Sequence, residues 1–386
     1  MANIIEKSFS LNLKVLHIMG LYSLGDNSVG LKSCILYFVF LVLPIILTFI
    51  NILMDKRTDN VVENAMVVYL VEAVDYCFKF LPFLYNPKKI QECINFFGDD
   101  NFAPKTDQER KIIDECIWVC RRNSFVYFCG ILLALIGWHF PVFFFKGRKL
   151  PLDIWLPYDP LSTAFRYYLT LIYVFGATFY IGFCGTTIDS LVGGLPYHAT
   201  AQLKILKYNL QHMDKFVDYT LRKRNEYIVE YRCVYKHLQY SINHHNKILR
   251  FLNEFEECFS VCIFSQFAGS LFGICFCCIG LTLVSVATVE GFTYIALIVD
   301  ITFQIFFYCY YGTLLYEESQ SLNNAIYMGP WYEFDIKTRK ILLTVMERAK
   351  RPMLITVGNV VDLTLVSLLS VLKTSYSLIA VLNTYE

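Results

Sequence analysis

Residues 351–386 read RPMLITVGNVVDLTLVSLLSVLKTSYSLIAVLNTYE, and from Met353 to Leu382 this stretch is apolar enough to cross a lipid bilayer. It nevertheless carries Asp362, Lys373 and several Ser and Thr residues, which a plain membrane anchor does not need. A charge at the middle of a membrane costs at least about 2.5–3.5 kcal/mol, so a helix of this kind is expected to face protein or water. The stretch predicts a last membrane span with a role beyond anchoring.

The rest of the chain has the composition of a membrane protein. Its 386 residues are 56% hydrophobic and 17% charged, whereas soluble domains carry about 25% charged residues. About 20 apolar residues cross a bilayer as a helix. We therefore predict one all-α membrane domain over residues 1–386 with seven transmembrane helices, near 34–54, 61–85, 124–146, 166–196, 258–289, 292–316 and 354–382.

The distribution of Lys and Arg predicts the orientation of the chain. Connections on the side of the N-terminus hold 26 of these residues, whereas the opposite side holds Lys56, Arg57, Lys146, Arg148 and Lys149, with Arg166 at the border. Positive residues accumulate on the cytoplasmic side of a membrane. The N-terminus is thus expected in the cytoplasm and the C-terminus outside, the reverse of a G-protein-coupled receptor. The net charge of +1 gives no reason to expect a nucleic-acid partner.

Two long inner connections, 197–257 and 317–353, have the pattern of amphipathic helices. In the first, Leu203, Leu206 and Leu210 recur at helical spacing with charged residues on the other faces. Residues 336–351, IKTRKILLTVMERAKR, repeat the pattern. We interpret both segments as a cytoplasmic anchor that extends the helices of the membrane domain.

Motifs of enzymes and metal sites are missing from the sequence. There is no Gly-rich phosphate loop, HExxH or GxSxG motif. The 14 cysteines lie mostly in apolar runs, where they act as small buried residues, and none is paired at zinc-finger spacing near a His. His244 and His245 are interpreted as part of a solvated helix face. We expect no enzymatic activity, no cofactor and no metal.

The second span carries charges within its apolar sequence. Asp75 and Lys79 are four residues apart and can pair on one helix, with Glu72 one turn earlier. This group is either a polar patch between helices or, with Tyr69 and Tyr76, part of a ligand chamber. The motif GSLFG (269–273) permits close helix approach.

Aromatic and small residues at a similar depth of four spans predict a mostly apolar small-molecule pocket. The alternative for each of them is ordinary helix packing. The candidate ligand-binding residues are Val68, Tyr69, Glu72, Tyr76, Ala134, Trp138, Tyr173, Ala177, Thr178, Tyr180, Tyr294 and Ile298.

The C-terminal 65 residues resemble the signature of insect odorant receptors. The matching landmarks are Ala325, Tyr327, Trp331, Pro352, Gly358 and the pair Tyr376-Ser377. The seven spans, the inward N-terminus and the length agree with this family. The resemblance implies a tetrameric cation channel whose pore is lined by the last helix of each subunit, with an odorant pocket in the outer halves of spans two, three, four and six.

The resemblance also implies a gate near the outer end of the last helix. It places the pore and gate at Tyr376, Ile379, Leu382 and Asn383. On one straight helix, Asp362 and Lys373 project together, whereas Ile379 projects about 100° away. We therefore assign the gate to Ile379 and the two charges to subunit packing or an inner vestibule.

Further implications concern partners and location. The chain lacks the insertion of the shared olfactory co-receptor before span five, so it resembles a ligand-tuning subunit that joins the co-receptor in a heterotetramer. The expected ligand is a small volatile such as an ester, aldehyde, alcohol or terpenoid. The expected location is the plasma membrane of the olfactory neuron dendrite.

Two other functions remain open from the sequence. A gustatory receptor channel of the same superfamily would take more polar ligands. A secondary transporter is suggested by the intramembrane charges Asp75, Lys79, Asp300 and Lys373, although the paired halves typical of transporters are missing.

Overall fold

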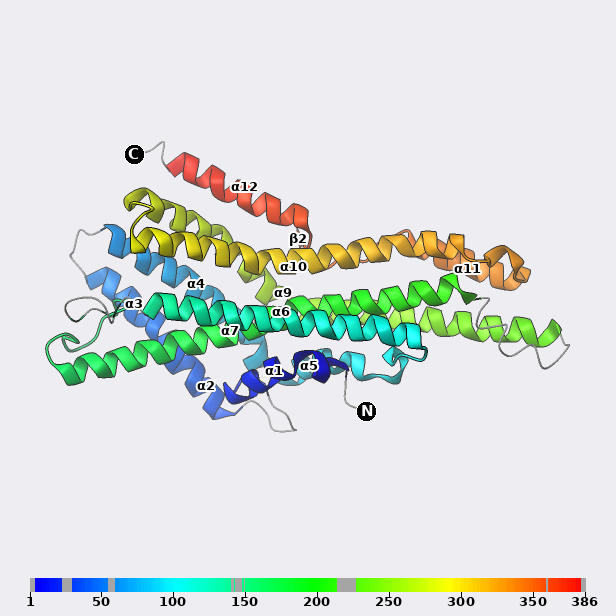
Figure 1. The fold of residues 1–386 in the computed structure, drawn as a ribbon, viewed down its shortest axis with the longest axis horizontal. Coiled ribbons are helices and arrows are strands. Elements are labelled where there is room, and N and C mark those ends of the chain that lie inside the picture. Colours follow the sequence, from blue (N-terminus) through cyan, green and yellow to red (C-terminus); the bar gives the residue numbers. More distant parts are fainter. Residues whose placement is uncertain are drawn as a thin grey trace.

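The computed structural model shows an elongated, almost entirely helical molecule (Figure 1). It describes residues 4–22, 30–54, 60–139, 142, 148, 150–213, 227–358 and 360–382. The helices are α1 (Ile4–Ile18), α2 (Leu31–Tyr37), α3 (Leu43–Met54), α4 (Asn60–Tyr85), α5 (Pro87–Asn95), α6 (Asp107–His139), α7 (Ala164–Gln211), α9 (Tyr227–Leu283), α10 (Val289–Met328), α11 (Ile336–Ala349) and α12 (Leu365–Leu382). A π-helical turn, Phe38–Val42, joins α2 to α3, and two short strands, β1 (Thr356–Val357) and β2 (Val361–Asp362), precede α12.

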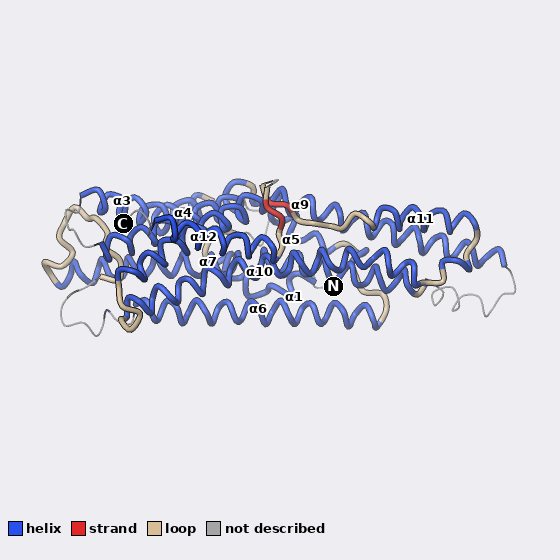
Figure 2. The backbone as a smooth tube through the Cα atoms, turned by 90° about the horizontal axis from the view of Figure 1, so that it is seen from above, coloured by secondary structure: helices blue, strands red, loops and turns tan. Residues whose placement is uncertain are grey.

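Four long helices, α6, α7, α9 and α10, run along the long axis of the molecule (Figure 1). Both views place α11 at one end beside the far parts of this bundle, while α3, α4 and α12 lie toward the other end (Figure 2). The described parts of the predicted amphipathic segment 197–257 are thus largely helical: α7 continues to Gln211 and α9 begins at Tyr227. Residues 214–226 of this segment lie outside the described residues. We call the end that holds α11 the anchor end and the opposite end the distal end.

Five helices in the described parts of the chain are long and apolar enough to cross a membrane: Leu31–Met54, α6, α7, Val234–Leu283 of α9, and α10. The helix α4 has the bounds expected for a span but carries Glu63, Glu72, Asp75 and Lys79. The helix α12 is a shorter apolar helix. The count of seven spans and the orientation of the termini therefore stay predictions.

Local sequence explains where several of these helices begin. The side chain of Thr163 accepts a hydrogen bond from the backbone N–H of Arg166 at the start of α7, and Thr288 does the same for Gly291 at the start of α10. Asp335 caps α11, and hydrogen bonds from the Thr338 hydroxyl and from backbone N–H groups lower the pKa of its carboxyl. Such caps satisfy donors that have no partner inside the helix.

The predicted last span is wrong in its first third. Residues 354–364 form the β1–β2 hairpin instead of a helix, and Gly358 in its turn has φ +60°. This segment is rich in β-branched residues, which favour extended structure. Asp362 therefore lies on β2 and Lys373 on α12, so the two charges do not share one helical stripe.

Side chains of α9 and α10 bind the backbone of this hairpin segment. The N–H of Thr356 donates to Glu256 Oε1 (2.6 Å) and that of Gly358 to Ser260 Oγ (2.8 Å). The N–H of Leu365 donates to Thr313 Oγ1 at 3.0 Å. The entry to α12 is thus fixed to two other helices by directed hydrogen bonds.

The interpretation of His244 and His245 as a solvated face is also wrong. Both side chains are buried, and His244 Nε2 lies 3.0 Å from Gln202 Oε1 of α7. The ring of His244 also lies 5.5 Å from that of Phe102. The buried stripe on this side of α9 is wider than its polar residues indicate, because His244 packs against α7 and His245 is also buried.

We predict that Gly312→Ala destabilises the folded receptor. A Cβ at Gly312 of α10 would lie 2.0 Å from the carbonyl oxygen of Leu363, which is backbone and cannot move aside. Overpacking of this kind costs about 1–3 kcal/mol, so the thermal unfolding temperature of the protein in detergent should fall. Gly130→Ala is the matched control, because a Cβ there meets nothing within 4 Å. Equal unfolding temperatures for the two variants would contradict the packing of the hairpin against α10.

Candidate ligand-binding site

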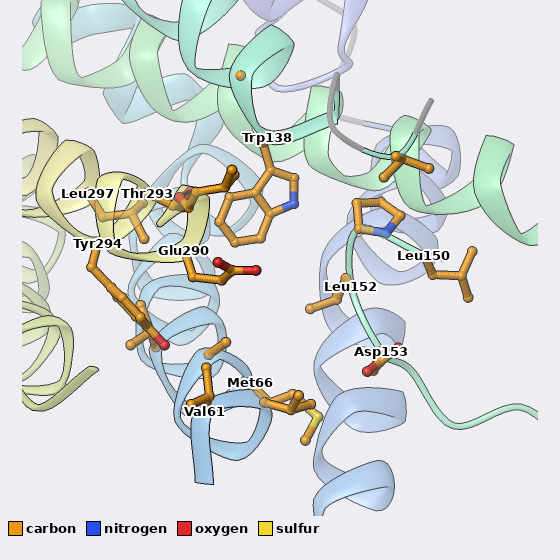
Figure 3. A pocket seen from close by; sticks show the side chains of 17 residues that line it. Val61, Met66, Trp138, Leu150, Leu152, Asp153, Glu290, Thr293, Tyr294 and Leu297 are labelled. Atoms are coloured by element: carbon orange, nitrogen blue, oxygen red, sulfur yellow. Dashed lines mark hydrogen bonds between the residues drawn. The ribbon is translucent and has the colours of Figure 1, made fainter. Parts of the chain in front are cut away.

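A cavity of about 280 Å³ lies at the distal end of the bundle. Three elements and one loop supply its walls: the first turns of α4, the end of α6, the start of α10, and the loop that precedes α7 (Figure 3). The lining residues are Val61, Val62, Ala65, Met66, Val68, Gly137, Trp138, Val142, Leu150, Pro151, Leu152, Asp153, Val289, Glu290, Thr293, Tyr294 and Leu297. A mostly apolar concave site with a few polar groups is the usual form of a small-molecule pocket.

The loop that closes one side of the cavity is held in place by helix α3. The N–H of Trp155 donates to the carbonyl of Leu47 at 3.1 Å, and Asn51 Nδ2 donates to the carbonyl of Asp153 at 3.5 Å. The side chains of Leu152 and Ile154 are buried against Val174 of α7. This wall of the cavity is therefore formed by contacts within the protein and does not require a ligand.

Trp138 and Glu290 are two of the polar side chains that line the cavity. The indole Nε1 of Trp138 is buried and makes no hydrogen bond within the described chain. In Figure 3 the indole of Trp138 and the carboxylate of Glu290 both extend into the cavity. A buried N–H without a partner costs about 1–3 kcal/mol. The site thus offers one donor and one charged acceptor to a ligand.

Another polar group of the cavity, the Tyr294 hydroxyl, already has a hydrogen-bond partner in the protein. Asn64 Nδ2 of α4 donates to this hydroxyl at 3.1 Å and lies 3.2 Å from the carbonyl of Phe276 on α9. This hydrogen-bonded group ties α4, α9 and α10 together at the floor of the cavity. A ligand that touches Tyr294 therefore touches the contact between three helices.

Toward the middle of the bundle, a buried ion cluster links α4, α7 and α10. The ammonium of Lys79 lies 3.4 Å from Asp75 Oδ2 and 3.1 Å from Asp189 Oδ1. The hydroxyl of Tyr308 donates to Asp189 Oδ1 at 2.6 Å. All four side chains are buried. The predicted pairing of Asp75 with Lys79 is confirmed. Asp189 was not predicted, because its partner Lys79 is 110 residues away in the sequence.

The GSLFG motif makes room for the acidic residues of α4, which confirms its predicted role in close helix approach. A Cβ on Gly273 would lie 2.6 Å from Glu72 Oε1, and one on Gly269 would lie 3.0 Å from the Cβ of Asp75. Glu72 Oε1 is buried and has no hydrogen-bond partner among the described residues. Asp300, another predicted intramembrane charge, accepts a hydrogen bond from Gln304 Nε2 at 3.0 Å.

Helix α12 packs on the bundle through one face only. Leu368 and Ser375 are buried against it, and the Ser375 hydroxyl lies 3.3 Å from the carbonyl of Leu271. The opposite face exposes Lys373 and Tyr376, and also Val366 and Leu369. Of the predicted pore and gate residues, only the side chain of Tyr376 is described. The side chains of Ile379 and Leu382, and the whole of Asn383, lie outside the described residues.

Comparison with known proteins identifies the family. The model of the family described as 7tm Odorant receptor matches residues 60–376, which is most of the chain. The chain belongs to the odorant receptor family. This confirms the family predicted from the C-terminal signature, and with it a multi-pass membrane receptor that is not an enzyme.

Individual relatives agree with this assignment over nearly the whole receptor. Odorant receptor Or1 of Anopheles gambiae is 25% identical over 360 residues, which cover 86% of this chain and 83% of that protein. Odorant receptor 23a of Drosophila melanogaster is 22% identical, with 96% and 94% covered. Among solved structures, olfactory receptor OR5 of Machilis hrabei in complex with eugenol has a TM-score of 0.82 at 16% identity, with 99% of each chain covered. The fold is therefore that of an insect olfactory receptor.

The predicted pocket residues of the receptor divide into those in the cavity and those elsewhere. Val68, Trp138 and Tyr294 line it. Three of the others lie close to the cavity: Tyr69 and Tyr173 pack beside the loop wall, and Ile298 packs near Tyr294. In the interior, Tyr76 and Tyr180 flank Phe80, Glu72 faces Gly273, and Ala177 is buried in α7. The Thr178 hydroxyl is hydrogen-bonded to His139, and Ala134 is exposed. Whether any of these twelve contacts a ligand stays a prediction.

Sequence reasoning missed Glu290, Met66 and Leu152 of the cavity lining. The position of Glu290 could have been recognised in the sequence, because Glu290 follows the capping residue Thr288. It therefore lies at the start of α10, in the predicted outer region. The loop residues carried no such signal, since their place depends on hydrogen bonds to α3.

We predict that Lys79→Met strongly destabilises the receptor. The substitution keeps most of the side-chain volume but leaves Asp75 and Asp189 without a cation, and breaking a buried pair costs about 3–5 kcal/mol. The amount of folded receptor after detergent extraction should fall sharply. Lys373→Met is the matched control, since this lysine is exposed. The triple variant Asp75→Asn, Lys79→Met, Asp189→Asn should recover folded protein; equal yields of Lys79→Met and the control would contradict the central role of the cluster.

Proposed function

We propose that this receptor is the ligand-tuning subunit of an odorant-gated, non-selective cation channel and that its ligand binds in the cavity at the distal end. The observation that carries the proposal is the preformed apolar cavity with an unpaired Trp138 N–H. The charge asymmetry of the sequence predicts that this end is extracellular, where a volatile arrives. The plasma membrane of the sensory dendrite is the site at which such a subunit acts.

The polar groups of the cavity favour a ligand with a hydroxyl group. A hydroxyl oxygen can accept from the Trp138 N–H, and its hydrogen can be donated to the Glu290 carboxylate. An ester or aldehyde can only accept, and so cannot donate a hydrogen bond to Glu290. The apolar walls contribute about 25 cal/mol for each Å² of ligand surface that they bury. Among the expected odorants, we therefore favour small alcohols with a compact apolar skeleton.

Opening of the channel requires that the ligand bind the open arrangement more tightly than the closed one. The cavity offers a route for this difference, because Tyr294 and Asn64 join the helices around it. Helix α12, with one free face, is the element that would line the pore in a tetramer with the olfactory co-receptor. The gate would then lie at Ile379, near the end of α12.

We predict that Trp138→Phe raises the half-maximal concentration of active alcohols about 2- to 13-fold, because one hydrogen bond is worth about 0.5–1.5 kcal/mol. The aromatic wall is kept, so responses to apolar volatiles without an oxygen atom should change little. Whole-cell currents from cells that express the receptor with the co-receptor measure both responses. Trp118→Phe is the control, since Trp118 lies exposed on the same helix outside the cavity. An equal loss of sensitivity in both variants would contradict the assigned site.

A second prediction concerns the partner. Odorant-evoked cation currents should appear when the receptor and the co-receptor are expressed together and should be missing when the receptor is expressed alone at the cell surface. Surface labelling checks that both samples hold the same amount of receptor. Currents from the receptor alone would show a self-sufficient channel, and saturable uptake without currents would support the transporter alternative.

A further inference from the structure

Two cysteines and one histidine meet between α6 and α7, away from the ligand cavity. Cys116 and Cys120 are one turn apart on α6, and His198 comes from α7. The two sulfurs and a ring nitrogen of His198 all lie within 4.8 Å of one another. In a tetrahedral zinc site, with Zn–S about 2.3 Å and Zn–N about 2.0 Å, neighbouring ligand atoms are about 3.5–3.8 Å apart. The three ligand atoms therefore lie within about 1.3 Å of the separation that one metal ion requires.

The three side chains are fully enclosed. Their exposed fractions are 2% for Cys116, 3% for Cys120 and 1% for His198. The Nε2 of His198 is buried and has no hydrogen-bond partner among the described residues. An unpaired polar atom in a dry site costs free energy, and a metal ion would remove that cost. A metal ion would give this nitrogen a strong partner, whereas the neighbouring Cys120 thiol gives it only a weak one.

The surroundings of the group are shaped for a close approach of α6 to α7. The rings of Phe9 and Phe97 lie 5.8 and 5.9 Å from the ring of His198. Gly194 lies one turn before His198, and a Cβ at this position would come 3.5 Å from Cys120 Sγ and 2.4 Å from the Phe9 ring. The helices meet closely here because this position has no side chain.

We propose that Cys116, Cys120 and His198 form a structural binding site for one thiolate-preferring d¹⁰ metal ion, Zn²⁺ or Cu⁺. Thiolate and imidazole are the ligands that both ions favour. Two thiolates neutralise Zn²⁺, and one thiolate with one thiol neutralises Cu⁺, so the enclosed site carries no net charge in either case. In the predicted orientation these three residues lie in the cytoplasmic half of the molecule. Cysteines in the cytoplasm stay reduced and can bind a metal ion.

The competing explanation is that the thiols only pack. Cys120 Sγ lies 4.0 Å from the carbonyl of Gly194, and Cys116 Sγ lies 3.8 Å from the carbonyl of Tyr197, so each thiol can donate a weak hydrogen bond. This explanation gives the His198 side chain a weak hydrogen bond with the Cys120 thiol. It also predicts that the purified receptor contains no metal at this position, which makes the two explanations separable.

The test is the metal content of the full-length receptor, purified in detergent with its co-receptor and measured by inductively coupled plasma mass spectrometry. We expect about one zinc or copper ion for each receptor chain, and its loss in the double variant Cys116→Ser, Cys120→Ser. The matched control is Cys93→Ser, Cys258→Ser, which removes a second pair of contacting buried thiols with no histidine in the group. The element found distinguishes Zn²⁺ from Cu⁺.

A second measurement keeps the proposal testable if the variants fail to fold. The wild-type receptor, treated with a chelator and then with Co²⁺, should develop the thiolate-to-cobalt absorption band, and His198→Cys should keep metal binding. The proposal is overturned if the wild-type protein neither contains metal nor takes up Co²⁺. Metal retained in the Cys116→Ser, Cys120→Ser variant, or lost equally in the control, would overturn it as well.

Discussion

The ammonium of Lys79 is the point on which the arrangement of the membrane helices depends. It lies in the interior between Asp75 on its own helix and Asp189 on α7, and Asp189 also holds the hydroxyl of Tyr308 on α10. Removing charges from water costs several kcal/mol for each ion unless they are paired in good geometry. Each helix must therefore present its polar group at one depth and in one direction, which fixes the register of α4, α7 and α10 relative to one another.

Other features follow from that fixed register. Gly269 and Gly273 let α9 approach the acidic side of α4, so that α9 closes the bundle around the cluster. With α4 and α10 held in place, their distal ends stand far enough apart to leave a cavity, and the loop pinned to α3 closes its side. The polar core supplies rigidity at the centre, while the apolar cavity supplies a binding site where the helices diverge.

The sequence was sufficient for the features that depend on local pattern. Apolar runs and amphipathic spacing predicted the long helices, and the C-terminal landmarks from Ala325 to Ser377 indicated the family. It was insufficient where distant residues decide the structure. Asp189 reads as an ordinary polar residue until α7 is placed beside α4, and His244 looks solvated until Gln202 of α7 faces it. The hairpin before α12 was not predicted, because the apolar residues of this stretch indicated a membrane helix. The β-branched residues around Gly358, which favour extended structure, were given too little weight.

The same reasoning explains the partial success at the cavity. Trp138 and Tyr294 are large aromatic residues near helix ends, which is a recognisable pattern, and both line it. Tyr76 and Tyr180 are also large aromatic residues, but they lie inside α4 and α7 and pack around Phe80. Sequence alone does not distinguish an aromatic residue that fills space from one that borders it, because the difference lies in the direction of the side chain.

The attachment of α12 has a mechanical consequence. Its first residue is bound to Thr313 and the hairpin before it to Glu256 and Ser260, whereas beyond this point the helix contacts the bundle along one side only. Such an element is a lever with its pivot at the hairpin. Eighteen residues at about 1.5 Å each give an arm of about 27 Å, so a tilt of about 10° displaces the tip by about 5 Å. A small tilt of α12 at the hairpin thus produces a much larger displacement at the C-terminal end of the helix. This displacement is comparable to the width of a hydrated ion.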